Sequence, residues 1–172
     1  YAGLALAQYA SGRREEAMAT WTRLGALGGD AASLAAEGLA DAAVLEGRLP
    51  DARVILEKGI EDDAQANREE ALGRKLALLG SIHLATGQPA KALALAERGR
   101  KATSADHVLF QVALVFLGAG EERKARAIAD DLEKRLGVDA RMYALILNGA
   151  VASRKKNHVE AVAKLKGAVQ VV

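Results

Sequence analysis

A serine followed three residues later by a lysine, Ser153 and Lys156, is the first pair whose types and spacing suggest chemistry. On a helix this spacing would bring the amine toward the hydroxyl, which is one way to activate a serine nucleophile. The companion motifs of serine–lysine enzymes are absent, and the spacing alone arises often by chance. We therefore interpret Ser153–Lys156 as an exposed turn and expect no catalytic residue in the chain.

Metal and phosphate chemistry find no better support. The chain's histidines are His83, His107 and His158. They are far apart in the sequence and lack the close spacing typical of zinc ligands. The carboxylates at 61–63 and 69–70 read as solvated helix ends. The glycines of residues 118–120 are not followed by the lysine and hydroxyl residue of a phosphate-binding loop. We expect neither a metal nor a cofactor.

Composition narrows the classes of protein further. The chain has 172 residues, of which 51% are hydrophobic, so it is too apolar for a disordered segment. It contains no cysteine, which excludes disulfides, thiolate nucleophiles and cysteine-bound zinc. A net charge of +2 makes nucleic acid an unlikely partner. The longest uncharged stretch, residues 76–90, is too short to span a membrane.

The last segment is more basic than the rest of the chain. Residues 137–172 carry six basic and two acidic side chains. The usual meaning of such a run is a solvated helix face, and no aromatic residues are interleaved for base stacking. Contact with a phosphate or an acidic protein remains open as an alternative.

The elements that position these residues follow from an internal repeat. A small residue is followed twelve positions later by alanine five times along the chain. The pairs are Ala5 with Ala17, Ala40 with Ala52, Gly80 with Ala92, Ala113 with Ala125, and Gly149 with Ala161. Five positions before the second alanine stands a glycine in four copies, and Lys156 in the fifth. Prolines number only two, and alanine and leucine dominate, so helices are expected throughout.

Each repeat is expected to form two antiparallel helices joined by a tight turn at the glycine. The small pair would let the two helix backbones approach closely. Leu4, Leu39, Leu79 and Val112 precede the first small residue and would supply buried apolar volume. One such hairpin cannot bury both of its faces, so neighbours should stack into a right-handed superhelix whose first helices line a concave groove.

The pattern resembles the tetratricopeptide repeat family over essentially the whole chain. Leu79-Gly80 with Gly87 and Ala92, and the run from Gly12 to Trp21, resemble that family's motif. Departures occur at the first-helix aromatic slot, at the missing terminal proline, and in the fifth copy at Asn148. The resemblance implies an all-α solenoid of about five helix-turn-helix repeats, expected at residues 1–29, 30–62, 63–102, 103–137 and 138–172.

The third repeat has extra residues before its first small residue. Residues 61–63 followed by 64–86 are more than one repeat helix needs. We expect a long first helix there, with Asp62 or Asp63 as its N-cap and Glu69 and Glu70 in its early turns.

In this family partners commonly bind along the groove, and the resemblance carries that role to matching positions of this chain. The expected groove residues are Leu6, Tyr9, Glu37, Asp41, Val44, Arg74, Ser81, Leu84, His107, Phe110, Leu114, Leu117, Tyr143, Ile146 and Arg154. The later ones form an apolar strip with arginines beside it, which suits an amphipathic helix or extended segment that presents leucines. The same residues could instead pack between adjacent helices, and that alternative stays open.

We therefore predict a noncatalytic scaffold that binds a protein or peptide. The alternative is a regulatory or effector-sensing arm of a larger signalling protein, such as a kinase or a transcription activator. The composition and the chain ends lead us to expect a piece of a longer bacterial protein. The sequence leaves the oligomeric state unknown and favours the cytoplasm over the periplasm.

Overall fold

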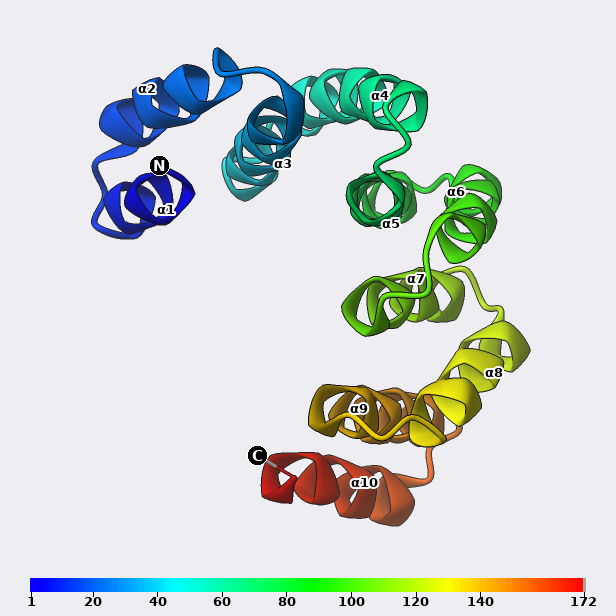
Figure 1. The fold of residues 1–172 in the computed structure, drawn as a ribbon. Helices are drawn as coiled ribbons and strands as arrows, with labels where there is room; N and C mark the ends of the chain where they lie inside the picture. Colours follow the sequence, from blue (N-terminus) through cyan, green and yellow to red (C-terminus); the bar gives the residue numbers. More distant parts are fainter. Residues whose placement is uncertain (172) are drawn as a thin grey trace. The chain divides into compact units, whose positions relative to one another are not determined.

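The computed structural model describes residues 1–171, and within that range the chain is helical with no strand. The helices are α1 (Ala2–Ala10), α2 (Arg14–Gly25), α3 (Gly29–Leu45), α4 (Leu49–Gln65), α5 (Glu69–Ala85), α6 (Pro89–Ala102), α7 (Asp106–Gly118), α8 (Glu122–Glu133), α9 (Val138–Arg154) and α10 (His158–Gln170) (Figure 1). Adjacent helices pack in a repeating pattern, which confirms the predicted all-α repeat fold. None of the described helices is long and apolar enough to cross a membrane.

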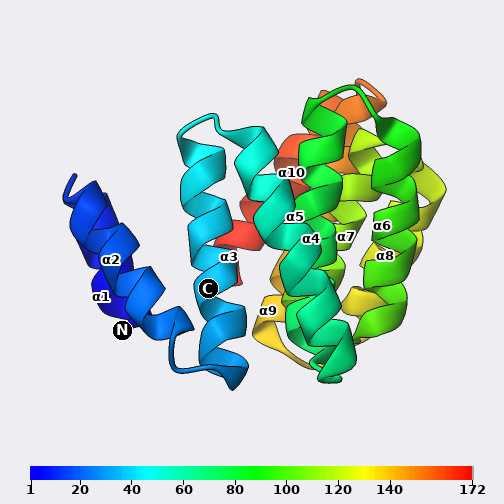
Figure 2. The same ribbon diagram turned by 90° about the horizontal axis from the view of Figure 1, so that it is seen from above.

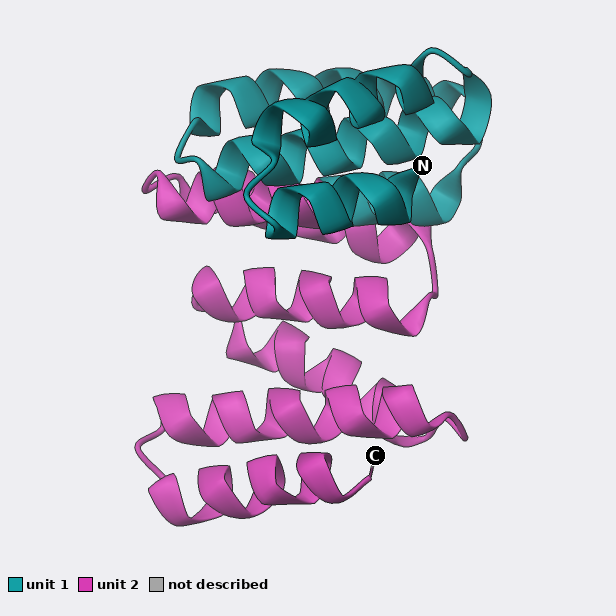
Figure 3. Ribbon diagram, turned by 90° about the vertical axis from the view of Figure 1, so that its left-hand side faces the viewer, with its two compact units in different colours: residues 1–75 teal, residues 76–172 magenta. Residues whose placement is uncertain are grey.

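Two compact units divide the chain, Tyr1–Lys75 and Leu76–Val172 (Figure 3). The boundary falls inside α5, so that helix begins in unit 1 and ends in unit 2. Within unit 1, α1 and α3 lie on one side and α2 and α4 on the other; within unit 2, α7 and α9 lie on one side and α6 and α8 on the other (Figure 1). We call the side formed by the first helices of the hairpins the first-helix face of each unit.

The small residues of each hairpin meet at the helix crossing, as predicted. Fully buried alanines occupy most of these slots: Ala5, Ala17, Ala40, Ala52, Ala92, Ala113 and Ala125. Where glycine takes the first slot, an added Cβ would lie close to the opposite backbone, 3.5 Å from the Ala92 carbonyl oxygen at Gly80 and 3.4 Å from that of Ala161 at Gly149. A Cβ would thus be in ordinary contact with the opposite backbone, and a side chain larger than alanine would press against the paired helix.

The turn inside each hairpin places one residue in the left-handed backbone region. Figure 2 shows such a turn between the antiparallel helices α3 and α4. In that turn Gly47 has a φ of +74°, and the glycines predicted for three other hairpins behave alike. In the fifth hairpin Lys156 takes this place with a φ of +60°. Because an L-residue with a Cβ pays roughly 1 kcal/mol or more in this region, the fifth turn is locally strained.

The junction between the second and third hairpins lies further along the chain than the sequence suggested. α4 continues to Gln65 and α5 begins at Glu69, so the expected boundary after residue 62 lies inside α4. Asp62 and Asp63 consequently belong to the last turns of α4 and cap no helix. No glycine or proline ends α4; Asn67 does so with a φ of +52°, a conformation that asparagine tolerates better than most residues.

Core packing differs between the units. In unit 2, Val112, Phe116 and Leu132 are fully buried in one apolar cluster. In unit 1, the Trp21 ring lies against the backbone of Gly38, where an added Cβ would be 2.4 Å from the indole. Leu79 and Val112 are buried as predicted, but Leu4 is 52% exposed. Leu4 stays exposed because α1 contacts α3 less extensively than α7 contacts α9.

Candidate interaction surfaces and a buried polar cluster

The first-helix face of unit 2 carries an aromatic pair and an exposed leucine. The rings of Phe110 on α7 and Tyr143 on α9 stack, with centroids 4.7 Å apart and an interplanar angle of 21°. Both residues are half-buried and rest on the apolar core. Leu114, one helical turn after Phe110, is 41% exposed. We call these three residues the aromatic platform.

The other predicted groove residues of unit 2 differ in the contacts that their side chains make. Leu84 is half-buried against α7, where a Cβ on Gly118 would lie 2.4 Å from its methyl group. Ile146 is half-buried one turn after Tyr143, and His107 is also half-buried. The Ser81 hydroxyl donates to the carbonyl of Ala77 at 3.2 Å, so it is partly satisfied within its own helix.

Two further residues of this set lie at opposite extremes of exposure. Arg154, at the end of α9, is exposed and has no ion-pair partner within residues 1–171. Leu117 is only 5% exposed and belongs to the core of unit 2, so it offers no surface to a partner. On α7, Leu117 follows the fully buried Phe116 and lies three residues after the exposed Leu114.

The first-helix face of unit 1 is polar. Arg74 on α5 donates from Nε to both carboxylate oxygens of Glu37 on α3, at 2.9 and 3.0 Å, and from a terminal nitrogen to Glu70 at 2.8 Å. The Tyr9 hydroxyl on α1 donates to Glu46 at 3.4 Å. Of the remaining predicted residues, Leu6 is 61% exposed and Val44 is half-buried.

Asp41 has an unusual environment on this face. It lies one turn after Glu37, and no cation pairs with it within the described residues. Loss of hydration raises the pKa of Asp41 to about 6, and repulsion from Glu37 adds to the effect. Because the residue remains exposed, solvent screens part of this cost. A cation placed beside Asp41 would be favoured over an anion.

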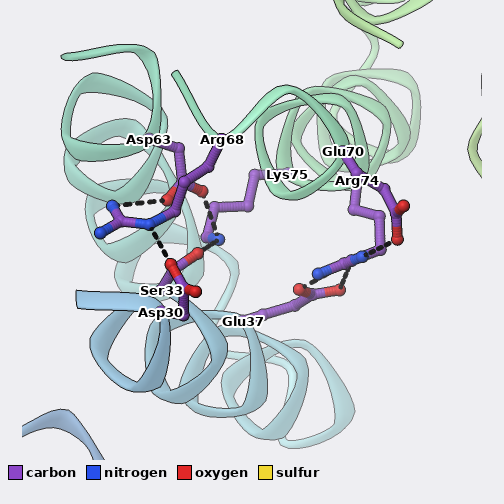
Figure 4. Close-up of polar contacts among 8 residues, drawn as sticks. All are labelled: Asp30, Ser33, Glu37, Asp63, Arg68, Glu70, Arg74 and Lys75. Atoms are coloured by element: carbon purple, nitrogen blue, oxygen red, sulfur yellow. Dashed lines mark hydrogen bonds and ion pairs between the residues drawn. The ribbon is translucent and has the colours of Figure 1, made fainter. Parts of the chain in front are cut away.

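A buried polar cluster joins α3, α4 and α5 in unit 1 (Figure 4). Lys75 and Asp63 are both fully buried, and the Lys75 ammonium donates to Asp63 Oδ2 at 2.7 Å and to the Ser33 hydroxyl at 2.8 Å. Arg68 donates from Nε to Asp30 at 2.6 Å and lies 3.6 Å from Asp63 Oδ1. The cluster thus ties the start of α5 to two helices of the preceding hairpin.

Two cavities adjoin this cluster, and the arginines that line them are paired with carboxylates. A cavity of about 410 Å³ is lined by residues of α3 and the start of α5, including Ser33, Arg68 and Arg74. A smaller one of about 180 Å³ lies beside Asp63, whose Oδ1 accepts no hydrogen bond. Arg68 pairs with Asp30 and Arg74 with Glu37, so neither arginine presents an unpaired charge to these cavities.

The family comparison adds to this geometry. The sequence model of the tetratricopeptide repeat matches residues 1–23, 33–58 and 76–98. These stretches fall on the first, second and third helical hairpins. The three matched hairpins are tetratricopeptide repeats. Neither a curated protein nor a solved structure matches the chain.

The fourth and fifth hairpins lie outside the matched stretches but keep the same construction. Ala113 with Ala125, and Gly149 with Ala161, form the buried small pairs. Gly120 and Lys156 supply the left-handed residue of the turn. Tetratricopeptide repeats generally act as protein-interaction modules and are typically noncatalytic.

The serine–lysine pair and the histidines considered in the sequence differ in exposure within the described part of the chain. Ser153 and Lys156 are exposed, and Lys156 lies in the turn after α9, where its N–H donates to the Ser153 carbonyl. His83 is 4% exposed, as expected for its packing slot, whereas His158 is exposed at the start of α10. No group of three or more metal-ligating side chains comes together within residues 1–171.

Sequence reasoning missed the Lys75 cluster. Gly59 carried a signal, because a glycine inside a helix leaves room for a neighbour: a Cβ there would lie 2.9 Å from Cε of Lys75. Asp63 follows Gly59 by one helical turn and therefore faces the same side. In α4, Gly59 leaves the space that the Lys75 side chain occupies, and Asp63 supplies the carboxylate that pairs with it.

Proposed function

We propose that this tetratricopeptide repeat chain is a noncatalytic scaffold that binds a peptide or helix of a partner protein on its first-helix face. The aromatic platform carries the proposal, because it places stacked, half-buried rings next to a leucine that is 41% exposed. Aromatic residues supported by a packed core are typical anchors of protein interfaces. The family's general role in protein interaction supports the same conclusion.

The platform favours a partner segment with leucine-like side chains. The platform residues Phe110, Leu114 and Tyr143 offer an apolar surface, and the side chain of Leu114 has no hydrogen-bonding group. Arg154, eleven residues after Tyr143 on the same helix, lies about 16 Å further along the axis at 1.5 Å per residue. Its unpaired guanidinium would favour an acidic residue at the far end of the bound segment.

A peptide-display selection tests this proposal. The wild-type chain and the Phe110→Glu, Leu114→Glu variant would be presented with one library, and the enriched peptides would be measured by fluorescence polarisation. We expect leucine-containing peptides that lose at least about tenfold in affinity on the double variant, since two anchors become charged.

A matched control separates the platform from the added charge. Ala127→Glu places a glutamate on the exposed surface of α8, on the other side of unit 2. It should leave the affinity unchanged. Equal affinity of the selected peptides for the wild type and the double variant, with helicity intact in both, would contradict binding at the platform.

A further inference from the structure

Unit 1 contains an apolar cavity on the side away from its first-helix face. The cavity has a volume of about 410 Å³ and opens between α2 and α4. Its floor is α3, through Ala32, Ala35, Ala36 and Leu39, and its walls include Trp21, Val54 and Ile55. Val54 is 67% exposed, so apolar surface continues from the cavity to the outside.

The corresponding space in unit 2 is smaller and more polar. Aligning the small pairs of the second and fourth hairpins matches Ala35 and Ala36 with the buried Val108 and Leu109. The opening that remains there measures about 240 Å³, and charged residues such as Arg100, Asp131 and Arg135 line it. The cavity of unit 1 therefore results from small residues at positions where the same fold accepts large ones.

The rim of the unit 1 cavity provides one donor and one acceptor. Lys58 and Asp62 on α4 form an ion pair at 3.2 Å, and both side chains are exposed. The Lys58 ammonium has more N–H donors than this pair uses, and the Asp62 carboxylate has further lone pairs. Because the pair is neutral as a whole, a neutral group that both donates and accepts matches it better than an ion of either sign.

We propose that this cavity binds a neutral, medium-chain aliphatic molecule with a hydroxyl-type end. The aliphatic chain would lie along α3 against Trp21, and the polar end would meet Lys58 and Asp62. The step from Ala32 to Leu39 spans about 10 Å, the length of an extended chain of about eight carbons. A mostly apolar cavity of this size with few polar groups at its rim is typical of small-ligand sites.

Trp21 makes the proposal measurable, because it is the only tryptophan of the chain and lines the cavity. Titration with 1-octanol, followed by tryptophan fluorescence, should give a saturable change. 1-Butanol should bind about 200-fold more weakly, since four fewer methylenes are buried at about 0.8 kcal/mol each. Octanoate and octylammonium should each bind at least about tenfold more weakly than 1-octanol.

Two variants locate the ligand. Ala36→Leu copies Leu109 of unit 2 into the cavity floor and should weaken 1-octanol binding at least about tenfold. Val54→Glu changes an exposed rim residue, which cannot disturb the core, and should also weaken it. Ala127→Leu, on the exposed surface of α8, is the matched control and should bind as the wild type does.

Three results would overturn the proposal. They are a fluorescence change that does not saturate, equal binding by the wild type and both cavity variants, and tighter binding of either charged analogue. The first would leave the space to an apolar side chain of a partner protein. Because the aromatic platform lies in unit 2, failure of this ligand would not affect the peptide-binding proposal.

Discussion

Lys75→Met tests whether the buried polar cluster stabilises unit 1. Methionine keeps the length of the side chain but removes the ammonium that Asp63 and Ser33 share. Asp63 would then be a fully buried carboxylate with only Arg68, 3.6 Å away, as a cationic neighbour. Breaking a buried pair in this way typically costs about 3 to 5 kcal/mol. With a total stability of about 5 to 15 kcal/mol, the variant should fold but be much less stable.

Urea denaturation measures the loss. Far-UV circular dichroism follows the whole chain, and Trp21 fluorescence follows unit 1, in which the tryptophan lies. With an m-value of about 2 kcal/mol per molar, the midpoint seen by Trp21 should fall by about 2 M. Lys58→Met is the control, because Lys58 is 77% exposed in its pair with Asp62 and should change stability by less than about 0.5 kcal/mol.

A double variant distinguishes a broken pair from a general packing defect. Lys75→Met with Asp63→Leu removes both charges, so no buried carboxylate is left without its partner. The double variant should be more stable than Lys75→Met alone. An unchanged midpoint for Lys75→Met, or a double variant that loses the sum of both single changes, would refute the reasoning.

Four further substitutions test other features. Gly38→Ala should destabilise by about 1 to 3 kcal/mol in thermal unfolding despite the better helix propensity of alanine, because the new Cβ would lie 2.4 Å from the Trp21 ring. Gly167→Ala, whose Cβ would make only ordinary contacts at 3.7 Å, should instead stabilise by up to about 1 kcal/mol. Lys156→Gly should stabilise by about 0.5 to 1 kcal/mol by relieving its left-handed backbone. Asp41→Asn should abolish a pH dependence: a carboxyl whose pKa rises to about 6 on folding makes the wild type less stable as pH increases from 4 to 6, by about 1 kcal/mol after solvent screening.

Each of these predictions would be contradicted by a particular result. If the two glycine variants shift the melting temperature in the same direction, close contact with the indole does not govern the first of them. If replacing Lys156 by glycine lowers stability, its positive φ is not a source of strain. If the urea midpoints of the wild type and Asp41→Asn run parallel from pH 4 to pH 6, Asp41 titrates as an ordinary surface carboxylate.

The hairpins were predictable because their determinants are local. A left-handed turn residue and a small pair lie within twelve positions of each other along the chain, so their spacing alone reveals them. Even the weak fifth copy obeys this logic, since Lys156 adopts the backbone of the glycine it replaces. The sequence misplaced the end of α4, because Asn67 is a weaker stop signal than glycine and residues 61–63 resemble a helix start.

The surfaces were less predictable because they depend on several helices at once. Leu114 and Leu117 belong to one helix and were assigned the same role, yet one is exposed and the other is in the core. Their difference is set by how closely neighbouring helices pack, which no single repeat encodes. The Lys75–Asp63 pair is a similar case, because its partners come from two hairpins and its acidic member looked like a cap. The role of the other groove residues in partner binding stays a prediction, because only a bound partner would test it.

The division within α5 has a consequence for recombining or truncating this chain. The first turns of that helix hold Arg74 and Lys75, which bond to α3 and α4, while its later part contributes Leu76 and Leu79 to unit 2. A fragment cut at the compact-unit boundary would sever a continuous helix and expose buried groups on both pieces. The connections at residues 66–68 and 103–105 are the sites at which modules can be exchanged, so the inheritable module is the hairpin rather than the compact unit.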